Sequence, residues 1–344
     1  MTKQTGGRRA PLFALTFAAL FVLAASVRYG AIDFSIPDIG RALASLLPGQ
    51  PEPTLDQRIF LELRLPRAVL SLLVGASLAV GGTLMQALFR NPIVEPGLVG
   101  TSSGAAFGSA LFFVLGGALD LGASLWSLPF AACAGGVLST CLVFLLARGR
   151  EDGRASVVML LLTGLAVNAL FMSGIGFLSY IARDPQARSI TFWSLGTLSG
   201  ASWRAVEIVA VSTVGGIVVA LRYAKQLNAL MIGEEEATYL GVNVNRLRWI
   251  ILFVNVVIVA VATAFTGVIS FVGLVVPHTL RMMRGADNRF LIAGSALAGA
   301  TLLSLADLIA RLSLRPAELP IGIVTSAVGV PVFLLLLRRR QYVF

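Results

Sequence analysis

Long apolar runs separated by short polar connections dominate this sequence. They lie near residues 11–27, 68–88, 93–116, 124–147, 156–181, 203–221, 248–270, 271–283, 290–310 and 320–337. A helix needs about 20 mostly apolar residues to cross the hydrocarbon core of a bilayer. Most runs reach that length, and the shorter run near 271–283 is expected to start from a turn. The pattern predicts an all-α polytopic membrane protein with about ten transmembrane helices, in one domain over residues 1–344.

The sequence also contains shorter segments and small-residue pairs that bear on the fold. Residues 189–200 and 314–320 are too short to span a bilayer, so we expect re-entrant or surface helices there. Small residues recur at four-residue spacing, as in Gly75 with Ala79 and Gly104 with Gly108. That spacing is typical of closely packed membrane helices.

One polar stretch interrupts the apolar pattern at residues 227–245, LNALMIGEEEATYLGVNVN. Its glycines and acidic residues are Gly233, Glu234, Glu235, Glu236 and Gly241. A glycine-bounded segment of this kind indicates a short helix between turns. Leu227, Leu230 and Met231 recur at helical spacing, so one side can rest on the membrane domain. The stretch is either a solvated loop or a docking element for a soluble partner, and periodicity alone does not decide.

The basic residues give the chain an orientation. Residues 3–9 carry positive charge before the first apolar run, as in a signal peptide, but a retained first span is preferred. The proline-containing segment 28–63 then lies outside. The basic stretches 148–154 and 338–340 fall on the inner side. By the positive-inside rule, both termini are expected in the cytoplasm.

Composition narrows the class further. Of 344 residues, 57% are hydrophobic and 13% are charged, against about 25% charged in soluble domains. The net charge of +10 is spread over the ends of apolar runs, where it sets topology, so no nucleic-acid partner is expected. The single histidine, His278, has no histidine or cysteine nearby in sequence, and we assign no metal site. Cys133 and Cys141 are eight residues apart, too far to bridge on one helix.

The predicted outer face carries more arginine than topology requires. The residues concerned are Arg58, Arg64, Arg67, Arg183, Arg188, Arg311 and Arg315. An acidic protein partner or an anionic substrate arriving from outside would account for them.

Several motifs together resemble those of one family. They are RLPR (64–67), GASLAVGGTLMQALFRNPIVEPGLVGTSSGA (75–105), GEEEATYLGV (233–242), GVISFVGLVVPHTLRMMRGADNR (267–289), SALAGATLLSLADLIAR (295–311) and ELPIGIVTSAVGVPVF (318–333). The chain looks like a FecCD-type permease subunit of the ATP-binding-cassette (ABC) importers for vitamin B12, iron-siderophores and haem. The resemblance runs from about residue 60 to the C-terminus.

The resemblance implies type II ABC importer permease architecture in a bacterial inner membrane. It implies a homodimer of ten-span subunits, two cytoplasmic ATPase subunits and a periplasmic substrate-binding protein. The stretch 227–245 is then the coupling segment that contacts the ATPase. The implied coupling residues are Gly233, Glu234, Glu235, Glu236 and Gly241, and the implied docking residues for the binding protein are Arg64, Arg67 and Arg311.

Other residues are candidates for the pathway and its gate. We expect the fifth span, the 189–200 helix and the last span to line the pathway. The candidate lining residues are Asn168, Phe171, Met172, Arg183, Arg188, Phe192 and Trp193. Asn91, Pro92 and Pro96 break the chain between two spans, and they form either an inner turn near the gate or a plain connection.

The chain is not expected to be an enzyme. Its two lysines, Lys3 and Lys225, do not end a glycine-rich phosphate loop, so ATP hydrolysis must lie in a partner subunit. The alternative is an ion-gradient-driven carrier, which needs acidic residues within spans. Glu95, Glu207 and Asp307 are the candidates.

The choice of load rests on charge and resemblance. Arg183 and Arg188 at the outer mouth could receive the propionates of haem, and residues 95–105 look closest to haem permeases. Vitamin B12 and ferric siderophores are the alternatives. Haem is expected as cargo, with no cofactor bound permanently.

Overall fold

The computed structural model describes residues 9–30, 32–48, 51–117, 126–147 and 157–338, and the regular secondary structure in these ranges is helical, with no strand. The helices are α1 (Arg9–Arg28), α2 (Ile36–Ala44), α3 (Leu55–Ile59), η1 (Phe60–Arg64), α4 (Leu65–Leu88), η2 (Pro96–Val99), α5 (Thr101–Leu115), α6 (Ser127–Leu146), α7 (Val157–Ile181), α8 (Asp184–Ser194), α9 (Trp203–Ile232), α10 (Glu234–Tyr239), α11 (Val244–Thr266), α12 (Val272–Arg284), α13 (Asn288–Ser313) and α14 (Ile321–Arg338).

The fold class predicted from the apolar runs is confirmed. Within the described residues, seven segments are long and apolar enough to cross a membrane; they lie in α1, α3 to α4, α6, α7, α9, α11 and α13. Helices α5 and α14 are shorter apolar helices, and α12 spans 13 residues. Each predicted run therefore corresponds to a helix.

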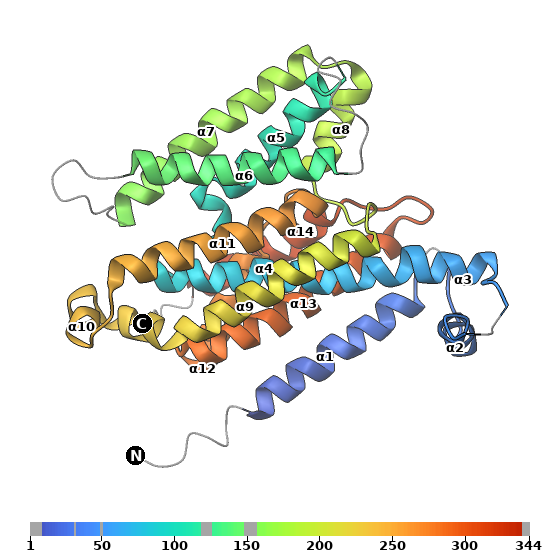
Figure 1. Ribbon diagram of the computed structural model, residues 1–344, viewed down its shortest axis with the longest axis horizontal. Coiled ribbons are helices and arrows are strands. Elements are labelled where there is room, and N and C mark those ends of the chain that lie inside the picture. The colour runs from blue at the N-terminus through green and yellow to red at the C-terminus, as the bar shows by residue number, and fades with distance from the viewer. Residues whose placement is uncertain (1–8, 31, 49–50, 118–125, 148–156, 339–344) are drawn as a thin grey trace.

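Helix α4 forms the centre of the bundle (Figure 1). In the 18-residue apolar window of its span, 83% of the residues are buried. In the corresponding windows of α1 and α7, 22% are buried. Helices α9, α11, α12 and α13 pack around α4, and α1 lies along α13. Helices α5 to α8 form a second group that contacts the bundle through α11 (Figure 1). The exposed faces of the outer helices are apolar, as a lipid environment requires.

The small-residue pairs allow helix backbones to touch. A Cβ atom on Gly75 of α4 would collide with the carbonyl oxygen of Gly299 of α13. A Cβ on Gly104 of α5 would collide with the carbonyl oxygen of Gly135 of α6. The prediction of close packing at these spacings is confirmed.

Replacing Gly75 by valine is expected to separate α4 from α13 and to lower the free energy of unfolding by about 1–3 kcal/mol or more. The measurement is thermal unfolding of the purified chain in detergent. Gly215→Val is the matched control, because Gly215 lies on exposed α9 with no atom within 4 Å of its added Cβ. An equal loss of stability in both variants would contradict the packing role.

The two ends of the bundle carry different elements (Figure 1). Helix α10 lies at one end, where α1 begins and α14 ends. Helices α2, α3 and α8 lie at the opposite end. The basic stretches 3–8, 148–154 and 339–340, used above for topology, lie outside the described residues.

Some predicted boundaries were wrong. The surface helix expected at 189–200 is α8, which begins at Asp184, because Pro185 occupies its first turn. Residues 314–320 form turns and an extended segment instead of a helix. Helix α9 continues to Ile232, so the first part of the polar stretch 227–245 extends a span.

Candidate functional site

Helix α10 is a short helix held between two glycines. Gly233 precedes it, and Gly241 follows it with a φ of 80°, a conformation that favours glycine. Leu227 and Leu230 before it are fully buried, and Ala237 within it is buried, so one side rests on the bundle as the spacing predicted. The segment forms a corner between α9 and α11.

Glu234 ties α10 to the membrane domain. Its Oε1 accepts a hydrogen bond from Nη2 of Arg248 on α11 at 2.9 Å, and Nη2 of Arg90 lies 3.8 Å away. The carboxylate of Glu236 folds back over Gly233, where a Cβ would collide with it. Glu234 is therefore an internal anchor, and Glu235 faces solvent.

The outward side of α10 includes apolar residues that the acidic pattern did not single out. Tyr239 is 88% exposed, Leu240 is 65% exposed and Ile232 is 69% exposed. Contiguous exposed apolar patches are typical of interaction sites, so these residues are candidates for a contact surface. A further signal was available in the sequence, because Glu235 and Tyr239 are four residues apart and share a helix face.

Replacing Glu234 by glutamine is expected to loosen α10 without unfolding the bundle, because a half-exposed ion pair contributes at most about 1 kcal/mol. Faster hydrogen exchange in residues 233–241 would show this. Glu235→Gln is the control, since its side chain is exposed and it has no ion pair to a described residue. Unchanged exchange in the Glu234 variant would contradict the anchoring role.

The three arginines predicted to dock a binding protein lie together at the opposite end, and they have internal partners. Asp307 of α13 is fully buried and binds two of them. Its Oδ1 accepts hydrogen bonds from Nη2 of Arg67 at 2.9 Å and Nε at 3.1 Å. Its Oδ2 lies 2.9 Å from Nε of Arg311, an ion pair without hydrogen-bond alignment. Glu318 accepts a further bond from Arg67 at 2.9 Å.

Arg64 and Arg311 also hold the last turn of α1 and the segment that follows it. Arg64 donates to the carbonyl oxygens of Tyr29 and Ile32 at 2.7 and 2.8 Å. Gly30 leaves room for its guanidinium group. Arg311 donates to the Ser26 hydroxyl at 2.6 Å. A docking role for these arginines stays a prediction, and the structure gives each of them a structural role that the sequence did not indicate.

The residues predicted at the gate form a tight connection beside α12. Oδ1 of Asn91 accepts the Ile93 backbone N–H at 3.0 Å. Pro92 lies in the turn, and the buried Pro96 begins helix η2. The carboxylate of Glu95 accepts the N–H of Phe271 at 3.0 Å, at the start of α12. Phe271 has a φ of 69°, which is unusual for a bulky residue, so Glu95 holds a strained junction between η2 and α12.

The pathway candidates on α7 differ in their surroundings. Asn168 accepts a hydrogen bond from Ser103 of α5 and donates to the Gly97 carbonyl at 3.4 Å, so it joins α7 to α5 and η2. Phe171 packs on Phe107, with ring centroids 5.2 Å apart. Met172 is 60% exposed. Of the three, Met172 is the most exposed.

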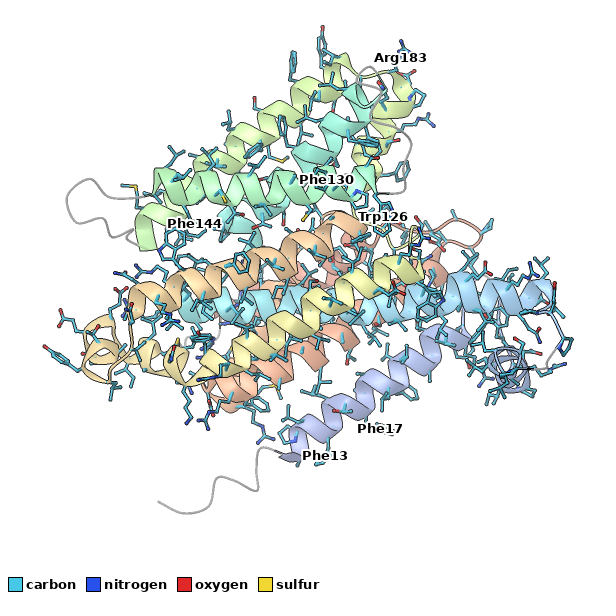
Figure 2. The ribbon with its side chains drawn as sticks, in the orientation of Figure 1. Phe13, Phe17, Trp126, Phe130, Phe144 and Arg183 are labelled. Carbon is cyan, nitrogen blue, oxygen red and sulfur yellow. The ribbon has the colours of Figure 1, made fainter. Side chains whose placement is uncertain are left out.

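Helix α8 lies at the end of the bundle opposite α10, beside the start of α14 (Figure 1). The backbone N–H groups of Ile321 and Gly322 donate to the carbonyl oxygens of Gly196 and Leu195, which joins α8 to α14. Arg183, labelled in Figure 2, and Arg188 are exposed. Phe192 is exposed, whereas Trp193 is buried. Helix α8 therefore contacts α7 and, through these hydrogen bonds, the start of α14. Trp193 packs in a buried cluster with residues of α5, α6, α7 and α11.

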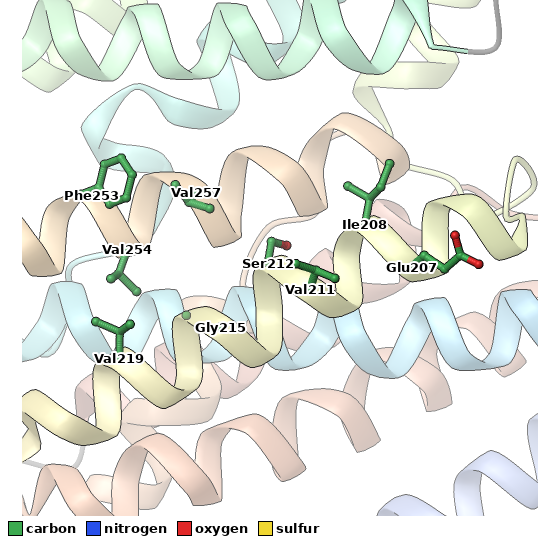
Figure 3. A pocket seen from close by; sticks show the side chains of 10 residues that line it. Glu207, Ile208, Val211, Ser212, Gly215, Val219, Phe253, Val254 and Val257 are labelled. Carbon is green, nitrogen blue, oxygen red and sulfur yellow. The ribbon is translucent and has the colours of Figure 1, made fainter.

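Two of the three acids proposed for a gradient-driven carrier are engaged internally. Asp307 is paired with arginines, and Glu95 caps α12. Glu207 is exposed at one end of an apolar groove of about 590 Å³ between α9 and α11 (Figure 3). The described residues contain no group of histidine, cysteine, aspartate and glutamate side chains suited to a metal ion.

Comparisons with known proteins agree with this architecture. The chain is 44% identical over 284 residues to the hemin transport system permease protein of Yersinia pestis, covering 82% of this chain and 84% of that protein. It is 40% identical over 289 residues to the cobalamin import system permease protein of Halobacterium salinarum, covering 84% and 76%.

A solved structure shares the fold. It is described as an inward-facing conformation of a metal-chelate type ABC transporter, and it matches with a TM-score of 0.82 at 33% identity, covering 95% of this chain and 98% of that chain. The chain also matches the FecCD transport family over residues 17–339. By a match that spans nearly its whole length, this chain belongs to the FecCD transport family.

Proposed function

We propose that the chain is the permease subunit of an ATP-driven importer that moves haem from the periplasm to the cytoplasm across a bacterial inner membrane. The observation that carries this proposal is the extended similarity to a hemin permease, with a higher identity than to the cobalamin permease. ATP hydrolysis takes place in a partner subunit. Vitamin B12 and ferric siderophores are the alternative loads.

The proposed assembly is a homodimer with two ATPase subunits and a periplasmic binding protein. The ATPases bind at the end that carries α10, which places both termini in the cytoplasm. The binding protein docks at the end that carries α2, α3 and α8. Helices α7, α8 and α14 line the pathway at the dimer axis. This placement is supported by the contact of α7 with α8, by the hydrogen bonds between the end of α8 and the start of α14, and by the exposed apolar face of α7.

The proposed mechanism transmits motion through α10. ATP closes the two ATPase subunits, and each carries the attached α10 with it. The Glu234–Arg248 hydrogen bond and the buried Leu227 and Leu230 link that motion to α11 and α9. Both helices pack on α4, so a shift at α10 reaches the centre of the bundle.

Docking of the binding protein is proposed near Arg67, whose partner Glu318 is 38% exposed. Arg64 and Arg311 support this surface by holding the segment after α1. Charge reversal at Arg64 and Arg67 is expected to weaken docking mainly through the association rate. Each variant has to be compared at equal thermal stability, because both side chains also have internal partners.

The identity of the transported substrate is tested by replacing the two exposed arginines of the outer mouth. Replacing Arg183 and Arg188 by glutamine is expected to lower haem uptake between about twofold and about thirtyfold, because an exposed ion pair with a propionate contributes ~0.2–1 kcal/mol. The measurement is uptake into vesicles containing the full transporter. Cobalamin and a ferric siderophore are supplied in parallel.

Arg58→Gln is the control for this double variant, since Arg58 is an exposed arginine of α3 at the same end. Haem uptake that stays unchanged in the double variant would contradict recognition of propionates. Uptake of cobalamin in preference to haem by the unaltered transporter would contradict haem as the load.

A further inference from the structure

A second groove lies between α1, α12, α13 and α14, and α14 is the one helix that it shares with the proposed pathway. Its volume is about 700 Å³, within the range of about 300–1,000 Å³ typical of ligand sites. Helix α1 forms one wall and α14 the other, while α12 and α13 form the floor. The lining is almost entirely aliphatic and aromatic, with Phe271, Val275, Leu302, Leu305 and Val328 as examples.

The polar side chains of the groove offer almost nothing to a polar ligand. Three threonines line it, and each hydroxyl donates to a carbonyl oxygen of its own helix. Thr279 bonds to Val275 at 2.7 Å, Thr301 to Leu297 at 2.8 Å, and Thr325 to Gly322 at 3.2 Å. Their hydroxyl protons are therefore used internally. The interior of the groove suits a hydrocarbon chain.

One end of the groove carries a positive charge. Arg284, the last residue of α12, lines the groove and is exposed. It forms no ion pair or hydrogen bond with any residue in the part of the chain that the structure describes. Pro11 of α1 and Phe290 of α13 line the same end, which is the end that carries α10. The groove thus joins a long apolar interior to a single free guanidinium group.

We propose that this groove binds one glycerophospholipid of the cytoplasmic leaflet, with an acyl chain between α1 and α14 and the phosphate on Arg284. The leaflet assignment rests on the orientation proposed above, whereas the binding itself does not. An apolar tail with an anionic head matches both chemical features of the groove. Basic residues at a membrane surface attract anionic lipid head groups in this way.

The position of α1 favours a lipid over another protein chain. Phe13 and Phe17 project away from the bundle and are each 72% exposed (Figure 2). Leu20 and Phe21 continue this apolar side at 59% and 66% exposure. A helix with such an outer face borders lipid, so the groove beside it opens toward acyl chains.

Native mass spectrometry of the purified transporter, released from nanodiscs of phosphatidylethanolamine and phosphatidylglycerol, tests the proposal. The unaltered chain is expected to retain one phospholipid more than Leu302→Trp, in which the groove is filled. Arg284→Gln is expected to bind phosphatidylglycerol about fivefold more weakly. Its binding of uncharged diacylglycerol should not change.

Two controls separate the groove from general effects. Leu138→Trp adds the same bulk to an exposed site on α6, and Arg222→Gln removes an exposed charge from α9. Both should retain lipid as the unaltered chain does. Because Arg284 is exposed, its variant keeps the test valid if Leu302→Trp does not fold.

Equal lipid retention in the unaltered chain, Leu302→Trp and Arg284→Gln would overturn the proposal. So would a disulfide-linked dimer formed by Thr301→Cys in a background with Cys133 and Cys141 replaced by serine, because a second copy would then cover the groove. Neither result would bear on haem uptake, which is measured separately.

Discussion

Replacing Asp307 by asparagine is expected to lower the free energy of unfolding by about 3–5 kcal/mol, the largest stability effect predicted here. Asp307 is fully buried and lies within 2.9 Å of both Arg67 and Arg311. Without its charge, two guanidinium groups remain in the interior with less compensation. The measurement is chemical or thermal unfolding of the purified chain in one detergent.

Glu318→Gln is the matched control for Asp307→Asn. Glu318 also pairs with Arg67 at 2.9 Å, but it is 38% exposed, so its loss should cost less than about 1 kcal/mol. Similar stability losses in the two variants would contradict the assignment of Asp307 as the centre of the arginine cluster.

Replacing both Tyr239 and Leu240 by alanine is expected to disconnect the chain from its ATPase. Buried aromatic and apolar anchors contribute about 2 kcal/mol or more to an interface, so affinity should fall about thirtyfold. Transport should be lost while the permease remains folded, because both side chains are exposed in the isolated chain. Binding of the purified ATPase subunit to the reconstituted permease provides the measurement.

Tyr180→Ala is the control for that variant. Tyr180 is 87% exposed, much like Tyr239, but it lies at the end of α7 opposite α10. It should bind the ATPase normally. Unaltered ATPase binding after loss of Tyr239 and Leu240 would exclude the outer face of α10 as the coupling surface.

The spans and the short helix α10 were predictable from the sequence because their signals are local. Apolar runs of span length identify helices without reference to their neighbours. The glycines at 233 and 241 delimit α10 in the same way, and the pairs Gly75 with Ala79 and Gly104 with Gly108 indicated close packing. The predicted start of α8, residue 189, was wrong because it followed the apolar residues of the helix. The helix begins at Asp184, where Pro185 in the first turn is a start signal.

The partners of the charged residues were not predictable, because they depend on contacts far apart in the chain. Arg67 meets Asp307 across 240 positions, and Arg311 meets Ser26 across 285. From sequence alone, an arginine near a span end is equally consistent with docking, snorkelling and internal pairing. The hydrogen bond between Glu95 and Phe271 was not predictable for the same reason, since only the folded bundle brings η2 to the start of α12.

Uptake of haem into vesicles containing the permease, its ATPase and its binding protein tests the central claim most directly. Haem accumulation is expected to require all three proteins and ATP on the side of the membrane that carries the ATPase. A proton or sodium gradient alone is expected to have no effect. Haem accumulation without the ATPase, driven by such a gradient, would contradict the account and would assign transport to a carrier mechanism using Glu207.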